Sequence, residues 1–104
     1  MLQTLIHYGI HFVLPVFVAI IFFKPKWLLA TLIMWACIAI DLDHLLATPI
    51  FDPTRCSINF HPLHTYYAIA VYAVLSFWKP SRILGIGLLI HILADSVDCL
   101  MMQL

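Results

Sequence analysis

The sequence predicts an all-α protein, a four-helix transmembrane bundle in which residues 1–104 form a single domain. Hydrophobic residues make up 64% of the chain and charged residues 10%, and its mean hydropathy is +1.06, values far from those of ordinary globular domains. Uncharged stretches such as residues 1–23 are too long and too apolar for a domain of this size to bury. In lipid, only a helix satisfies its backbone polar groups within one segment, so we expect helices and not strands.

Four helices are expected, at about residues 2–23, 27–46, 62–78 and 82–102. Their limits follow from three interruptions of the apolar pattern, where proline and charge both oppose the continuation of a buried helix. The interruptions are Lys24-Pro25-Lys26, Thr48 to Phe60, and Lys79-Pro80-Ser81-Arg82.

Each helix has its own local signal. The first is uncharged up to Lys24, and we expect Pro15 to kink it. The second begins at Trp27, directly after Lys-Pro-Lys. The third begins with Pro62, because proline suits the first turn of a helix. The fourth begins at Arg82 and continues almost to the end of the sequence.

Basic residues predict the orientation of the bundle. The first and third connections carry Lys24, Lys26, Lys79 and Arg82, whereas the second carries Arg55 balanced by Asp52. The positive-inside rule therefore places the first and third connections in the cytoplasm and both termini on the non-cytoplasmic side. We expect an integral, multi-pass protein of a bacterial inner membrane.

Acidic residues inside the predicted helices are the strongest functional signal. Four of the five aspartates lie there, namely Asp41, Asp43, Asp95 and Asp98. A carboxylate at this depth costs several kcal/mol unless it is paired, protonated or coordinated, and the five basic residues all lie outside the spans. Compensation must come from protons, from imidazolium groups or from a bound cation.

The spacing of these residues favours a cation. His91, Asp95 and Asp98 follow one stripe of the fourth helix, His7 and His11 stand one turn apart on the first, and Asp41 and His44 share a face of the second. His61 and His64 begin the third helix from the same side, so the helix directions bring all these groups to one depth. Imidazole nitrogens and carboxylate oxygens suit zinc, manganese or iron. We therefore expect a divalent metal, zinc above all, as one or two ions.

The predicted metal ligands are His11, Asp41, Asp43, His44, His61, His64, His91 and Asp95. For Asp43 two roles stay open: it bridges two ions, or it orients a histidine from outside the ligand set. The sequence contains no glutamate. General acid or base catalysis would therefore fall to Asp43, Asp98 or His7.

Two motifs resemble those of a known family. Asp41-Leu42-Asp43-His44 resembles the D-x-D-H signature, and His91-Ile92-Leu93-Ala94-Asp95 the H-x-L-x-D signature, of the YdjM-like predicted membrane-bound metal-dependent hydrolases. Gly9-Ile10-His11 is similar to the N-terminal glycine and histidine of that family. His61-Pro62-Leu63-His64-Thr65 stands where the family carries H-R-G-x-T-H-S, but without the arginine and glycine and with the histidines three apart instead of five. The resemblance implies metal-dependent hydrolysis and a distant likeness to zinc phospholipases of the C type.

The function expected from these observations is a membrane-embedded metal-dependent hydrolase acting on a lipid or lipid-linked phosphate ester. The alternative is a metal-ion or proton transporter or channel subunit that uses the same Asp/His cluster. A third possibility is a structural protein that binds a partner, although it leaves the buried aspartates unexplained. The expected partners are membrane lipid and a divalent metal. Net charge is zero and no Lys/Arg stripe is present, which disfavours nucleic acid.

Two further expectations concern packing and covalent structure. Gly85 and Gly87 permit close approach of the fourth helix to a neighbour, either within the chain or in a homodimer. Cys56 and Cys99 are both expected near the outer face, where an oxidising compartment would allow them to form a disulfide.

Overall fold

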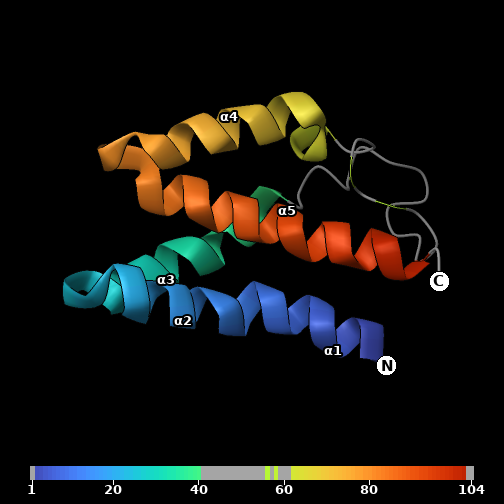
Figure 1. Ribbon diagram of the computed structural model, residues 1–104, viewed down its shortest axis with the longest axis horizontal. Coiled ribbons are helices and arrows are strands. Elements are labelled where there is room, and N and C mark those ends of the chain that lie inside the picture. Colours follow the sequence, from blue (N-terminus) through green and yellow to red (C-terminus); the bar gives the residue numbers. More distant parts are fainter. Residues whose placement is uncertain (1, 41–55, 57, 59–61, 103–104) are drawn as a thin grey trace.

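A computed structural model describes residues 2–40, 56, 58 and 62–102, and among these residues it contains helices and no strand. The predicted all-α class is therefore confirmed. The α-helices, labelled in Figure 1, are α1 (Leu2–Tyr8), α2 (Leu14–Phe22), α3 (Trp27–Ala36), α4 (Tyr66–Phe77) and α5 (Arg82–Met102). Short 3₁₀ turns at Lys24–Lys26 and Lys79–Ser81 join α2 to α3 and α4 to α5.

Helices α1 and α2 form one continuous rod, as predicted, but with a π-helical turn at Gly9–Val13 between them. Within this turn the Leu14 N–H donates to the Gly9 carbonyl, five residues earlier. Pro15 follows at once; it has no N–H to donate, and its ring would meet the His11 carbonyl in a regular α-helix. The disturbance expected from Pro15 thus coincides with a widened turn.

The bounds of the other three predicted helices agree with the structure to different extents. The fourth, predicted at residues 82–102, coincides with α5. The third begins later than predicted, because Pro62–His64 form a separate 3₁₀ turn before α4 starts at Tyr66. The second begins at Trp27 as predicted and continues beyond α3 as 3₁₀ turns over residues 37–40; the rest of its predicted range lies outside the described residues.

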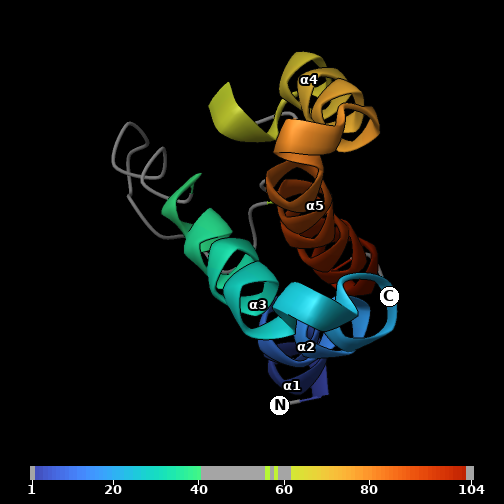
Figure 2. The ribbon, with the colours of Figure 1, turned by 90° about the vertical axis from the view of Figure 1, so that its left-hand side faces the viewer.

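Helix α5 lies at the centre of the molecule, with α4 on one side and α1, α2 and α3 on the other (Figures 1 and 2). Two apolar clusters surround it. Ala19, Ala30, Met34 and Ile90 join α2 and α3 to α5. Cys37, Tyr72, Leu88 and Ile92 join α5 to α4 and to the residue that follows α3.

Glycines allow the closest of these contacts. A Cβ at Gly85 would lie 2.5 Å from the Ser76 backbone nitrogen on α4, and a Cβ at Gly87 would lie 2.9 Å from the Met34 Cα on α3. Both glycines are therefore used in packing within one chain, one toward each neighbouring helix. This removes them as support for the expected homodimer, which stays a prediction.

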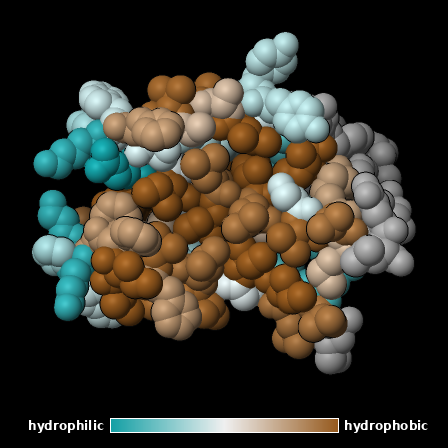
Figure 3. All heavy atoms as spheres, in the orientation of Figure 1, coloured by the Kyte–Doolittle hydropathy of each residue, from teal (hydrophilic) through white to brown (hydrophobic). Residues whose placement is uncertain are grey.

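The face of the molecule seen in Figure 3 is apolar over most of its described residues, and hydrophilic side chains gather at one end of it. The turns that carry Lys24, Lys26 and Lys79 share that polar end, whereas the two chain ends lie at the other (Figure 1). Side chains such as Phe22 and Phe77 are 72% and 82% exposed. Two stretches, Leu2–Phe22 and Lys79–Met102, are long and apolar enough to cross a membrane by length and composition, while α4 has 12 residues and is shorter.

Substitution of the buried glycines tests the close packing of α5 against α4 and α3. We expect Gly85→Ala and Gly87→Ala each to lower the free energy of unfolding by about 1–3 kcal/mol, because the added methyl meets backbone atoms. Thermal unfolding in detergent, followed by helical circular dichroism, measures this. Gly9→Ala is the matched control: its Cβ would meet nothing within 4 Å, so its stability should be unchanged or slightly higher. Equal stability of all three variants would contradict the packing described.

Candidate metal centre

His64 is held by the turn that precedes α4. Thr65 is the N-cap of α4, and its Oγ1 accepts a hydrogen bond from the Ala68 N–H at 3.3 Å. The same hydroxyl donates to the Pro62 carbonyl at 3.1 Å, and the Tyr72 hydroxyl donates to the Leu63 carbonyl at 2.7 Å. These bonds fix both ends of the turn, and they leave the His64 side chain fully buried against α5.

Helix α5 presents His91 and Asp95, one turn apart, to His64. The Asp95 Oδ2 atom lies 2.9 Å from His64 Nε2 and 3.3 Å from His91 Nε2. The two imidazole Nε2 atoms are themselves 3.3 Å apart. All three side chains are buried, with Asp95 the most exposed residue at 6%.

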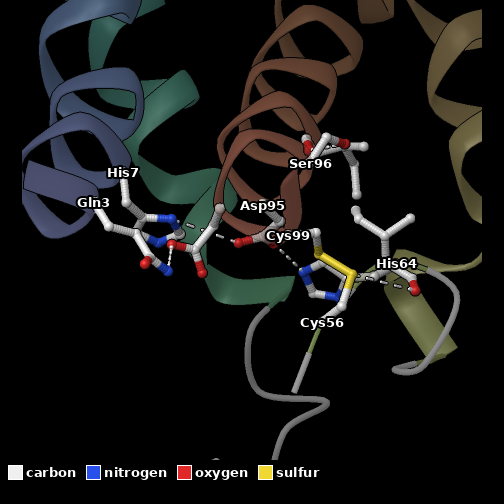
Figure 4. Close-up of a disulfide and its surroundings, with 10 residues drawn as sticks. Gln3, His7, Cys56, His64, Asp95, Ser96 and Cys99 are labelled. Atoms are coloured by element: carbon white, nitrogen blue, oxygen red, sulfur yellow. Dashed lines mark hydrogen bonds and ion pairs between the residues drawn. A yellow bond between two sulfur atoms is a disulfide. The ribbon is translucent and has the colours of Figure 1, made fainter. Parts of the chain in front are cut away.

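Two further imidazoles approach Asp95 from α1 and the π-helical turn. His7 Nδ1 lies 3.9 Å from Asp95 Oδ1, the oxygen that does not face His64. The rings of His7 and His11 lie 4.5 Å apart between centroids, and those of His11 and His91 4.4 Å apart. Figure 4 shows Asp95 between His7 on one side and His64 on the other.

These side chains form two groups that could each hold a metal ion. One contains His64, His91 and Asp95, the other His7, His11 and Asp95, and within each group the ligand atoms lie within 4.8 Å of one another. An ion with ligands at 2.0–2.1 Å in tetrahedral geometry separates them by about 3.3–3.4 Å, close to the distances in the first group. Imidazole and carboxylate donors suit zinc, manganese and iron alike, so the donor set does not identify the metal.

Asp98, a predicted proton-transfer residue, belongs to neither group. Its Oδ1 accepts a hydrogen bond of 2.7 Å from the Gln3 side-chain amide on α1. Gln3 was not among the predicted site residues. Its spacing of one turn from His7 was an available signal, because the two residues share a face of the first helix.

Cys56 and Cys99 form the disulfide that the sequence left open, with a Cα–Cα distance of 5.0 Å. Cys99 lies one turn after Asp95 on α5, and Figure 4 shows the bond beside His64. The bridge therefore ties the segment before α4 to α5 next to the first group. Cys37 is a free, buried cysteine packed against Gly87.

Four predicted ligands, Asp41, Asp43, His44 and His61, lie outside the described residues. Their roles stay predictions. The described candidates come from different parts of the chain: His7 from α1, His11 from the π-helical turn, His64 from the turn before α4, and His91 and Asp95 from α5.

Comparison with known proteins gives a family. The family model described as a family of unknown function, DUF6122, matches residues 1–102. The chain belongs to DUF6122. No curated protein and no solved structure matches this DUF6122 chain. The resemblance to YdjM-like hydrolases stays a prediction.

A pair of aspartate variants tests whether the buried groups of this DUF6122 chain bind metal. We expect Asp95→Asn to lower the affinity for zinc by more than about 100-fold, since loss of groups outside the ligand set already costs 10–100-fold. Asp98→Asn, three residues away on α5 but in neither group, should retain the parent affinity. Isothermal titration of the metal-free protein in detergent measures both, and equal affinities of the two variants would speak against this centre.

Proposed function

We propose that this DUF6122 chain is a membrane-embedded, metal-dependent hydrolase that acts on a lipid or lipid-linked phosphate ester. The observation that carries the proposal is the triangle of ligand atoms from His64, His91 and Asp95, separated by 2.9–3.3 Å and almost completely buried. Three protein ligands are typical of catalytic sites, because they leave a further position for water or substrate.

A divalent ion at this centre would acidify water and stabilise negative charge on a phosphoryl oxygen. The protein contributes a fixed arrangement of ligands. The Tyr72 and Thr65 hydrogen bonds hold the turn that carries His64, and α5 sets the one-turn spacing of His91 and Asp95. Because the His64 and His91 imidazoles already face one oxygen of Asp95, these side chains would move little when an ion binds.

Asp98 is the residue that we propose for proton transfer. It follows Asp95 by three residues on α5, and the Gln3 amide donates a hydrogen bond to one of its two carboxylate oxygens. That bond orients the carboxylate and leaves the other oxygen to accept a proton. His7, the other described candidate, is placed so close to Asp95 that a ligand role suits it better.

Orientation in the membrane is supported by two independent features. Lys24, Lys26 and Lys79 lie at one end of the molecule, which favours that end as the cytoplasmic one. At the other end, beside His64, Cys56 and Cys99 form a disulfide, which is typical of an oxidising compartment. We therefore propose that the metal centre lies toward the non-cytoplasmic face.

A lipid substrate follows from this placement. At 1.5 Å per residue, Asp95 lies roughly 20 Å along α5 from Arg82, within a hydrocarbon core of about 30 Å. That depth brings the centre within reach of the outer headgroup layer, and the apolar exterior in Figure 3 suits contact with acyl chains. A transport function receives less support, because the two segments next to the basic Lys24–Lys26 turn, residues 15–23 and 27–36, contain no aspartate or histidine.

Lipid hydrolysis gives a direct test. Phospholipids and lipid-linked phosphates are incubated with zinc-loaded protein, and the products are identified by mass spectrometry. We expect Asp95→Asn to abolish product formation and Asp98→Asn to slow it by about 10²–10⁴-fold, the usual contribution of a positioned acid or base. Tyr67→Phe, at a residue 89% exposed, is the matched control and should keep the parent rate. Product profiles identical for all four proteins would reject the hydrolase proposal.

Reporter fusions test the orientation. Alkaline phosphatase needs an oxidising compartment, so a fusion at the C-terminus should be active and one after Lys26 inactive. Green fluorescent protein at the same two sites should show the reverse pattern. If the phosphatase fusion at the C-terminus is inactive and the green fluorescent protein fusion at the same site is fluorescent, the C-terminus is cytoplasmic and the proposed orientation is wrong.

A further inference from the structure

We infer that Asp95 bridges two divalent ions, and that His7 and His11 supply the ligands of the second. This rests on the metal centre of the proposed function, although not on hydrolysis itself. The first ion would take His64, His91 and the Oδ2 oxygen of Asp95. The second would take the Oδ1 oxygen, which faces His7.

The distance between His7 and Asp95 supports a shared ion and not a hydrogen bond. His7 Nδ1 lies 3.9 Å from Asp95 Oδ1, beyond the range of a hydrogen bond. Two ligands of one ion, each about 2.0–2.1 Å from it, are separated by about 3.3–3.4 Å in tetrahedral geometry and by at most about 4.2 Å, so an ion between His7 and Asp95 would draw the two atoms slightly together. His7 Nδ1 is buried and has no hydrogen-bond partner among the residues that the structure describes. A buried nitrogen that faces a carboxylate oxygen at this distance is suited to a cation between them.

The π-helical turn is the second supporting feature. It spans Gly9–Val13 and so contains His11, whose ring lies in edge contact with both His7 and His91. Such turns are uncommon and occur frequently at functional sites. Here the turn lies where α1 passes α5, and it presents His11 buried at 6% exposure to the centre.

The position of the two groups beside each other bears on the class of substrate. His11 of the second group and His91 of the first group have ring centroids 4.4 Å apart, and Asp95 belongs to both groups. The two candidate ion positions are therefore neighbours. Paired ions about 3.5–4 Å apart stabilise both the attacking and the leaving oxygen of a displacement at phosphorus. A paired centre therefore suits the phosphate ester of the proposed function as the substrate class.

Zinc stoichiometry tests this inference. Metal-free protein in detergent is incubated with zinc chloride, desalted, and analysed for zinc and protein by elemental analysis. We expect two zinc ions per wild-type chain and one per His7→Ala chain, since Asp95, His64 and His91 remain. His7→Gln, which keeps a polar side chain of similar size, should also bind one. Gln3→Ala, one turn away on the same helix and in neither group, is the control and should bind two.

The outcomes separate this inference from the proposed function. One zinc per wild-type chain overturns the second ion, and two zinc ions in both His7 variants overturn the assignment of His7 as its ligand. Either result overturns this inference and leaves the proposed function intact. Two ions in wild type and one in the His7 variants, without any lipid hydrolysis, supports the inference and rejects the hydrolase. No zinc in wild type overturns both.

Discussion

The structure depends on one constraint, the compensation of the Asp95 carboxylate within an apolar helical bundle. Asp95 is 6% exposed, and among the described residues imidazoles approach its oxygens: His91 from the preceding turn of α5, and His7 and His64 from other elements. A buried carboxylate without such neighbours would destabilise the fold. The same imidazoles belong to the two groups that could each hold a metal ion, so the side chains that make the burial of Asp95 possible are also the candidate ligands.

Close packing around α5 makes this convergence possible. Gly85 lets α4 approach on one side, and Gly87 lets α3 approach on the other. The turn that carries His64 precedes α4, so its distance to Asp95 depends on how closely α4 and α5 pack. Interactions between backbones far from the centre therefore determine the distances within it.

The sequence predicted those features that depend on composition and local chemistry. Charge and proline marked the start of α5, and the period of a helix placed His91 and Asp95 on one stripe. Other features depend on packing between helices. Neither the Gln3–Asp98 hydrogen bond nor the division of the Asp95 oxygens between His64 and His7 has a signature in the local sequence. The late start of α4 follows from Thr65, whose capping role competes with the helix-starting tendency of Pro62.

The disulfide separates the two groups of candidate ligands covalently. Cys56 and Cys99 are separated by 43 residues, and closing a loop of that length restricts the unfolded chain by about 4 kcal/mol in the loop-entropy description. His64, His91 and Asp95 all lie inside this covalent ring, whereas His7 and His11 lie outside it. The bridge therefore closes a covalent ring that contains the whole first group, whereas the two histidines of the second group are joined to this ring only through the rest of the chain and through packing.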